Sequence, residues 1–404
     1  MRVALIGCGG VGDAFARIIV RRTFIDILVL ADVDPIKPHE LAKLVSGGSA
    51  TPIPVRLDAR DPVAIADMLA THNIDAVVNA CDPRFNPPIF QAAEKYGCMY
   101  LDLAMNLSAP HPTHPYQQVG TVLGADQLGA HDRWRDNGKL AIVAMGVEPG
   151  LSDVFARYAA DHLFASVDEI GVRDGGNLVI EGYAFAPTFS IWTTIEECLN
   201  PPIIYERARG WFTTEPFSEP EVFTFPGGIG PLECVNVEHE EVLLIPRWIP
   251  SVNRVTFKYG LGQEFIDVLK TLHLVGLDST QRIQVNGVSV SPRDVLAATL
   301  PDPSKLGHRM HGKTCAGTWV TGTDHAGKRL EVYLHHIVDN AWSMEQYECQ
   351  AVVWQTAVNP VIALELVHLG SWSGSGVLGP EAFDAIPFLD LLGKYGVPHC
   401  VEIR

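Results

Sequence analysis

The chain has 404 residues, 47% of them hydrophobic and 19% charged, which is the composition of a globular protein long enough for two or more cores. With 30 Lys and Arg residues against 47 Asp and Glu residues, its formal net charge is −17, which argues against nucleic acid or an anionic membrane as the main partner. No apolar run reaches the roughly 18 residues that span a bilayer, and the first strand begins at the N-terminus. We therefore expect no transmembrane segment, no signal peptide and a cytoplasmic location.

The eight cysteines show neither a C-x-x-C pair nor any zinc-ligand spacing. Without an export signal, they are expected to be reduced thiols, several of them buried. The only local histidine clusters are His111 with His114 in a Pro-rich loop, and the pair His335 and His336, which favour loop and strand residues over metal ligands. We expect no metal site.

The first stretch of the chain predicts a dinucleotide-binding turn. Val3 to Ile6 is an apolar run typical of a buried parallel strand, and Gly7, Gly9 and Gly12 follow in G-x-G-x-x-G spacing before a helical pattern. The first glycine permits a tight turn, the second lets a pyrophosphate approach the backbone, and the third lets helix and strand pack closely. The N-terminus of the helix then offers free N–H groups to the phosphates.

A second apolar strand, Ile27 to Leu30, leads to Asp32, which lies 20 residues beyond Gly12. A carboxylate at this distance is expected to bind the adenosine ribose hydroxyls and to repel a 2′-phosphate. No Arg directly follows Asp32, and Arg21 and Arg22 precede the strand. The sequence therefore predicts NAD as the cofactor in preference to NADP.

The chain up to about residue 145 continues as alternating strands and helices, which predicts a doubly wound parallel sheet of the Rossmann type. The further strands are expected at 54–58, 75–81, 97–104 and 140–145, with helices at 40–45, 62–71 and 89–96. Ligands of such sheets bind beyond the carboxyl ends of the strands. We assign cofactor binding to the glycine-rich turn and to these strand ends, namely Gly7, Gly9, Gly10, Val11, Gly12, Asp32, Val33, Asp58, Ala80 and Cys81.

After Gly150 the pattern changes to strands interrupted by fewer helices, which predicts an α+β domain with a mixed sheet. Residues 324–327 are expected to form a hairpin turn. The strands are expected at 167–172, 178–185, 220–225, 240–245, 254–259, 281–285, 318–321 and 329–337, and the helices at 151–163, 192–199, 262–272 and 292–298.

The C-terminal part combines two apolar helices, at 350–368 and 380–392, with a short strand at 397–403. A helix that is apolar around most of its circumference must be buried. We therefore expect three parts: a nucleotide-binding domain over 1–148, a substrate and dimerisation domain over 149–350, and a segment 351–404 that packs back on the first domain. The apolar strands expected at 242–245 and 332–337 outnumber the helices available to cover them, which predicts a homodimer.

Several motifs, taken in order, resemble the saccharopine dehydrogenase family. They are the glycine-rich turn, Asn79-Ala-Cys with Asn86, the segment 97–102, Glu148-Pro-Gly, the segment 172–176, the segments 223–233 and 255–260, and the helix around Gln355. Members of this family interconvert an amine and an imine with a nicotinamide cofactor. The length and the Leu30-Ala-Asp-Val-Asp stretch most resemble lysine 6-dehydrogenase.

The chemistry that this resemblance implies needs a group that moves a proton and a group that holds the substrate carboxylate. For proton transfer we expect Asp102, which ends a strand on the binding rim, with Lys258 and Glu148 next and His335 as a further candidate. For the substrate we expect Arg173, Asp174 and Arg254, with Arg247 as a further candidate. The alternative for each Arg is an ion pair with a neighbouring acid, and for Asp102 it is a structural hydrogen bond.

Two classes of function follow from these expectations. The first is an NAD(P)-dependent oxidoreductase acting on a CH–NH or CH–NH₂ carbon of a small lysine-like or opine-like amino acid, with an imine reductase resembling carboxynorspermidine synthase as the alternative. The second is a regulatory protein that binds a dinucleotide without catalysis, because a fold alone does not establish an activity.

Overall fold

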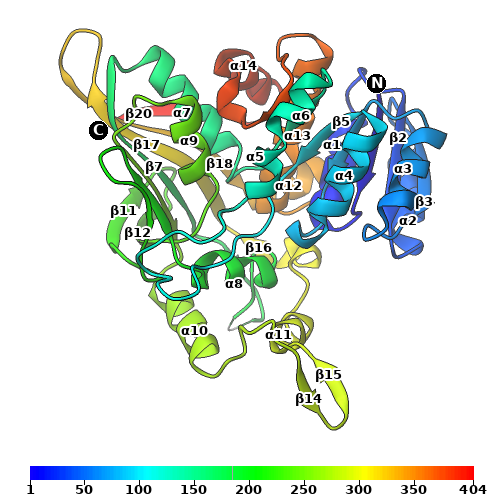
Figure 1. The fold of residues 1–404 in the computed structure, drawn as a ribbon, viewed down its shortest axis with the longest axis horizontal. Coiled ribbons are helices and arrows are strands. Elements are labelled where there is room, and N and C mark those ends of the chain that lie inside the picture. Colours follow the sequence, from blue (N-terminus) through cyan, green and yellow to red (C-terminus); the bar gives the residue numbers. More distant parts are fainter. Residues whose placement is uncertain (184) are drawn as a thin grey trace.

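The computed structural model describes residues 1–183 and 185–404 and contains two large sheets (Figure 1). The N-terminal sheet has seven strands in the order β19-β6-β5-β4-β1-β2-β3, and all its pairings are parallel. Its strands are β1 (Arg2–Ile6), β2 (Ile27–Asp32), β3 (Thr51–Arg56), β4 (Ala76–Asn79), β5 (Met99–Asp102), β6 (Leu140–Ile142) and β19 (Gly376–Leu378). The predicted Rossmann-type architecture is confirmed.

Helices cover this parallel sheet, as its apolar strands require. The strands β4 and β5 are buried along their whole length. The helices that belong to this part of the chain are α1 (Gly10–Ile19), α2 (Ile36–Leu44), α3 (Pro62–Thr71), α4 (Asn86–Tyr96), α5 (Ala125–Gly129) and α6 (His131–Asp136). The short helix η1 (Pro83–Phe85) follows β4 at the carboxyl end of the sheet.

The second sheet has nine strands, and its main path runs β10-β9-β13-β7-β17-β18-β20. Only β13 and β7 pair in parallel, which confirms the mixed sheet. Its strands are β7 (Ser166–Gly176), β9 (Ile203–Glu206), β10 (Gly210–Thr213), β11 (Glu221–Phe225), β12 (Gly230–Asn236), β13 (Arg254–Gly260), β17 (Lys313–Thr323), β18 (Arg329–Asp339) and β20 (Cys400–Ile403).

The remaining elements surround this sheet. The helices are α7 (Leu151–His162), α8 (Ile191–Leu199), α9 (Glu241–Trp248), α10 (Gln263–Leu274), α11 (Pro292–Thr299), α12 (Asn340–Tyr347), α13 (Ala351–His368) and α14 (Ala385–Lys394). Short strands and turns are β8 (Val179–Ile180), β14 (Ile283–Val285), β15 (Val288–Val290), β16 (Met310–His311), η2 (Pro303–Lys305), η3 (Gly307–Arg309) and η4 (Pro380–Ala382).

The expected strand at 240–245 is wrong, because these residues belong to α9. Its residues 241–246 are all buried, and a short apolar run that is buried on every side shows no period by which helix and strand can be distinguished. The strand expected at 178–185 is present only as β8, and it extended over residue 184, which lies outside the described residues. One of the two strands from which a homodimer was argued is therefore a helix, and the homodimer stays a prediction.

The long C-terminal helix α13 lies against α1 of the nucleotide-binding part (Figure 1). Its length and mean hydropathy of 1.2 would allow it to cross a membrane, but 78% of it is buried inside the protein, including the polar side chains of Gln355 and Asn359. The helix is therefore part of the core, as its apolar circumference predicts.

The rest of the C-terminal segment divides between the two sheets. β19 pairs with β6 and extends the parallel sheet, so the chain does return to the nucleotide-binding part. However, β20 pairs with β18 at the edge of the second sheet, which corrects the expectation that the whole of 351–404 packs on the first domain. The segment therefore ties the two sheets together.

A buried pair of carboxyl groups joins η4 to α7. Glu381 and Asp153 are both fully buried, and Asp153 Oδ2 accepts the N–H of Gly150 at 2.8 Å while neither oxygen of Glu381 has a donor in the described structure. Burial raises the pKa of Glu381 from 4.5 to about 7 and holds the pKa of Asp153 well above its usual range. The two groups therefore share a proton in the folded state that the unfolded chain has already lost.

This pair predicts a stability that falls as the pH rises. Because the folded-state pKa of Glu381 is raised, its contribution is complete below about pH 4 and is lost as the pH rises through about 7. In Glu381→Gln, an amide replaces the titrating group, so the loss of unfolding free energy between pH 5 and pH 8 should shrink by roughly 1 kcal/mol or more. Denaturant titrations at both pH values measure this, with exposed Glu345→Gln as the control. An unchanged pH dependence in Glu381→Gln would contradict the shared proton.

Candidate active site

The glycine-rich turn between β1 and α1 is shaped to receive a pyrophosphate. A Cβ on Gly7 would lie 2.8 Å from the Ala80 carbonyl, and one on Gly12 would lie 1.9 Å from the carbonyl oxygen of Gly7, so both positions pack too closely for a side chain. Above Gly9 the space is open for 4 Å. No side chain caps the N-terminus of α1, whose N–H groups are left to bind an anion. These residues fit the phosphates of a dinucleotide.

Asp32 at the end of β2 is held next to this turn. Its Oδ2 accepts the N–H of Cys8 at 2.9 Å, and its Oδ1 accepts the N–H of Asp34 at 2.9 Å. Val33 beside it is exposed. Asp58 lies beyond β3 and is bound by Arg60, whose hydrogen bonds lower the pKa of Asp58 to about 2. Asp58 is therefore held in an ion pair at the surface and does not line the cavity described below.

A cavity of about 600 Å³ lies between the carboxyl end of the parallel sheet and the second sheet. Among the residues assigned to the cofactor, those that line it are Gly10, Val11, Ala80 and Cys81. The opposite walls come from β7, β13, α8, the end of α11 and the beginning of α13. The cavity thus opens from the nucleotide-binding turn into the second domain.

Five carboxyl groups line this cavity, those of Asp82, Glu148, Asp174, Glu197 and Asp302. One histidine, His239, joins them. No Lys or Arg is among the described residues that form its walls. The cavity therefore attracts cations and does not offer the guanidinium that the sequence analysis expected for a substrate carboxylate.

The three cations chosen from the sequence lie on the opposite face of the second sheet. Side chains alternate along β7 and β13, so Asp174, Phe257 and Tyr259 line the cavity while Arg173 and Lys258, which are paired across the two strands, point away from it. Arg173 is only 2% exposed and donates to Glu221 at 2.5 Å, and Lys258 donates to the same carboxylate at 2.7 Å. The assignments of Arg173 to substrate and of Lys258 to proton transfer are corrected accordingly.

Arg254 also faces away from the cavity. It donates to Glu219 at 2.7 Å and to Glu206, and it lies 3.5 Å from Glu169. Of the further candidates, Arg247 is exposed at the end of α9 and His335 is buried on β18. All three are outside the walls of the cavity.

Asp102 is a structural residue at the end of β5. It is 1% exposed, and its carboxylate accepts the N–H of Ala144 at 2.7 Å, the hydroxyl of Tyr100 at 2.9 Å and the Gln127 amide at 2.6 Å. Burial raises the pKa of Asp102 to about 7 in spite of these three donors. Leu103 lines the cavity, but Asp102 does not. The expected role of Asp102 in proton transfer is therefore corrected: its carboxylate holds neighbouring segments together through hydrogen bonds.

Glu148 and Asp174 are brought together at the cavity wall. Glu148 Oε1 accepts the N–H of Gly317 at 3.1 Å, and the carboxyl groups of Glu148 and Asp174 are within hydrogen-bonding reach of each other. Burial raises the pKa of Asp174 to about 6 and that of Glu148 well above its usual range. The pair therefore holds one shared proton near neutral pH.

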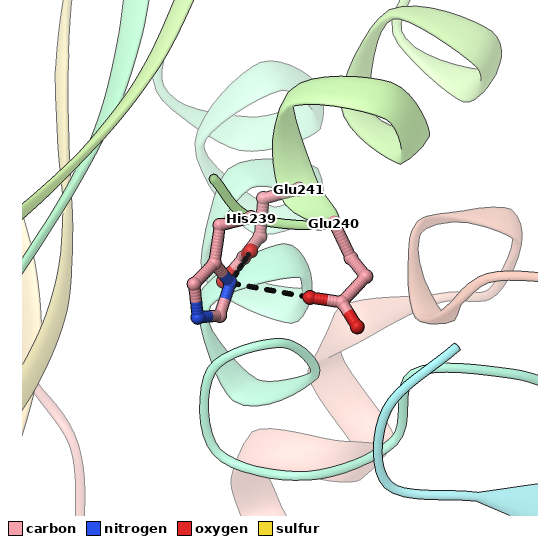
Figure 2. Close-up of side chains that lie close together, drawn as sticks. All are labelled: His239, Glu240 and Glu241. Carbon is pink, nitrogen blue, oxygen red and sulfur yellow. Dashed lines mark hydrogen bonds and ion pairs between the residues drawn. The ribbon is translucent and has the colours of Figure 1, made fainter. Parts of the chain in front are cut away.

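His239 was missed by the sequence analysis and lies just before α9 (Figure 2). Its Nδ1 is 2.5 Å from Glu241 Oε2 and 3.5 Å from Glu240, and its ring stacks on Phe257 with 3.7 Å between the ring centres. Burial opposes protonation, but the charge and hydrogen bond of Glu241 outweigh it and raise the pKa of His239 to about 10. Figure 2 shows the other ring nitrogen, Nε2, pointing away from both carboxylates.

The cluster of His239, Glu240 and Glu241 is close enough to hold a metal ion, but its atoms already satisfy one another. Glu241 receives the Ser152 hydroxyl at 2.7 Å and Glu240 receives the N–H of Met105 at 3.0 Å. With Nδ1 bound by Glu241, the arrangement is that of a histidine oriented by a carboxylate, a common form of general acid.

Glu197 on α8 completes the ionisable lining and was also missed. Burial raises the pKa of Glu197 to about 8. For His239, a signal was available in the sequence. It is the run of four ionisable residues from Glu238 to Glu241, at the start of an apolar segment for which a strand is predicted. Glu197 carries no such signal, because it is an ordinary polar position of an amphipathic helix.

The arrangement can bind an ammonium group, exclude water and deliver a proton next to a dinucleotide. Comparisons with known proteins identify the family. Residues 3–142 match the family model for the saccharopine dehydrogenase NADP binding domain, and residues 146–397 match that for the saccharopine dehydrogenase C-terminal domain.

The chain is 28% identical to a carboxynorspermidine synthase of Vibrio cholerae serotype O1, with 98% of this chain and 96% of that protein covered. It is 30% identical to a carboxynorspermidine synthase of Vibrio alginolyticus over 86% of this chain and 82% of that protein. A carboxyaminopropylagmatine dehydrogenase of Synechocystis sp. is 27% identical, with 98% and 96% covered.

Among solved structures, the apo saccharopine dehydrogenase (L-Glu forming) of Saccharomyces cerevisiae has the same fold, with a TM-score of 0.71 and 15% identity over 100% of this chain and 99% of that one. Together, the two family models cover nearly the whole chain. The protein belongs to the saccharopine dehydrogenase family and is an oxidoreductase that uses a nicotinamide dinucleotide.

Proposed function

We propose that this enzyme reduces the imine formed between an amine and an aldehyde, producing a carboxylated polyamine of the kind named in its Vibrio relatives. The observation that carries the proposal is the cavity wall of five acids without Lys or Arg in the described residues. Polyamines are chains of ammonium groups, which such a wall attracts. The relatives named for carboxynorspermidine and carboxyaminopropylagmatine support the same substrate class.

The same wall disfavours saccharopine, which belongs to the substrate class expected from the sequence. Saccharopine carries several carboxylates, and a carboxylate next to Glu148, Asp174 or Glu197 would be repelled without a compensating guanidinium. A carboxylated polyamine carries a single carboxyl group, which needs fewer hydrogen-bond donors. The hydroxyls of Ser190 and Thr193 in the cavity wall can donate to it.

When bound, the reduced nicotinamide supplies a hydride to the imine carbon. The protein's own part is to place that carbon and to deliver a proton to the nitrogen, which becomes the secondary amine of the product. His239 holds a proton that Glu241 stabilises, and Nε2 is the nitrogen free to donate it. The pair Glu148 and Asp174 binds the ammonium group of the amine that is not reacting.

Cellular location and assembly remain proposals. All eight cysteines are unpaired thiols, which supports the cytoplasm, where thiols stay reduced. We also propose a homodimer through the second domain, which light scattering would show as a particle of twice 44.1 kDa.

Substrate choice tests the proposed function directly. With NADH or NADPH, cofactor oxidation should require both an amino-acid aldehyde and a diamine such as putrescine or its three-carbon homologue. Saccharopine and lysine should not reduce NAD or NADP. Above pH 8, where the carboxyl group of Glu197 is ionised, Glu197→Gln should raise the KM for the diamine about tenfold by removing one buried charge, whereas exposed Glu264→Gln should not. Turnover of saccharopine without turnover of the diamine would refute the proposal, and binding of cofactor without any turnover would favour a regulatory protein.

Proton donation by His239 predicts a defined pH profile. His239→Gln should lower kcat by about 10²-fold or more, the effect of a lost general acid. Glu241→Gln removes the charge that raises the pKa of His239, so the fall of activity at alkaline pH should move to a lower pH by one unit or more. Glu240→Gln is the matched control, because its carboxylate is 1 Å farther from Nδ1 and its effect should be smaller. Equal profiles for Glu241→Gln and the wild type would contradict this role.

For the cofactor we propose NAD in preference to NADP, because the carboxylate of Asp32 lies where a 2′-phosphate would bind. The structure adds that Arg56 on β3 is paired with Asp32 across the two strands. In Asp32→Ala, a 2′-phosphate should therefore meet Arg56 without repulsion, and the preference for NADH should fall by tenfold or more. The double change with Arg56→Ala should not gain NADPH affinity. Equal or tighter binding of NADPH by the wild type, measured by nicotinamide fluorescence, would refute the preference.

A further inference from the structure

A segment of the second domain lies directly on the pyrophosphate turn. A Cβ added to Gly10 would lie only 2.8 Å from the Cβ of Ser304, so Ser304 leaves no room for a side chain at position 10. Gly10 is the first residue of α1, and Ser304 belongs to η2, which follows α11. Residues 300–304 also form part of the cavity wall opposite Val11 and Cys81. This contact therefore joins two domains at the cofactor site.

The position of the pyrophosphate follows from the turn itself. It binds the N–H groups at the start of α1, over the open space at Gly9, and so it lies beside Gly10. The cavity wall near the pyrophosphate contains acids such as Asp82 and Asp302, but no Lys or Arg among the described residues. Lys305 follows Ser304, and its ammonium group would balance part of the negative charge of the pyrophosphate.

We propose that Ser304 and Lys305 form a second-domain clamp on the pyrophosphate of the dinucleotide. Ser304 contributes its hydroxyl as a donor, and Lys305 contributes its ammonium group. The proposal depends on the nicotinamide cofactor of the family and not on the amine substrate proposed above.

In the local structure both groups are held by one carboxylate, that of Asp302. Asp302 caps η2 by accepting the N–H of Ser304 at 3.0 Å and its hydroxyl at 2.7 Å, which fixes the backbone of the segment. Lys305 is 80% exposed and forms an ion pair with the Asp302 carboxylate, with 3.7 Å between Nζ and Oδ2. Buried Leu306 anchors the segment just beyond. On cofactor binding, Ser304 can exchange Asp302 for a phosphate oxygen while the backbone stays in place.

The test measures binding and needs no turnover. Ser304→Ala and Lys305→Ala should each weaken ADP-ribose and NADH by about tenfold in calorimetry, because each removes a hydrogen bond to a charged phosphate. Adenosine lacks the pyrophosphate and, measured as a competitor of NADH, should bind unchanged. Exposed Lys328→Ala in the turn between β17 and β18 is the control for loss of one positive charge and should leave both affinities unchanged.

The salt dependence adds an independent measure, because Lys305→Ala should make ADP-ribose binding less sensitive to ionic strength. Unchanged affinity for ADP-ribose in both variants would overturn the clamp. An equal loss for adenosine and ADP-ribose would also overturn it, since the segment would then act on the shape of the whole site. Either result leaves the amine chemistry untouched, so failure of the clamp is distinct from failure of the proposed function.

Discussion

The alternation of side chains along two parallel strands, β7 and β13, determines the chemistry of this site. Neighbouring residues such as Arg173 and Asp174 lie on opposite faces of the second sheet, and so do Lys258 and Tyr259. Arg173 and Lys258 meet Glu221 of β11 on one face, while Asp174 and the aromatic rings line the cavity on the other. A shift of one residue in this register would place Arg173 and Lys258 in the cavity instead of Asp174 and Tyr259.

Burying so many acids in and around the cavity has a cost that the structure offsets with protons and not with Lys or Arg side chains. Glu148 shares a proton with Asp174, Asp153 shares one with Glu381, and Glu241 is balanced by protonated His239. Each of these arrangements reduces the charge that must be desolvated. The protein therefore holds several of its buried acids partly neutral.

The nucleotide-binding turn was predictable from the sequence because its signals are contiguous. Strand, glycines, helix and Asp32 occur within 32 residues, and each has a local physical reason. The same locality made the parallel sheet and the buried helix α13 predictable. The second domain was less so, because both faces of its sheet are covered and the sequence does not reveal which face of β7 meets the cavity. Asp102 illustrates the limit. Its predicted position at the end of a strand was correct. The sequence could not show that its carboxylate binds Tyr100, Gln127 and Ala144 and not a ligand, because two of these partners are far from it in the chain.

His239 shows why proton chemistry was the hardest part to locate. Its function depends on Glu241, two residues later, on Phe257 from β13 and on Ser152 from α7, and these meet only when the segment before α9 turns inward. A carboxylate that orients one ring nitrogen leaves the other to donate, and stacking on Phe257 fixes the plane in which it does so. His239 thus lies on the cavity wall formed by the second domain, whereas the residues that would hold the dinucleotide lie on the side of the parallel sheet. In the proposed reaction the proton would come from one domain and the hydride from the cofactor held by the other, so the site needs both sheets to border one cavity.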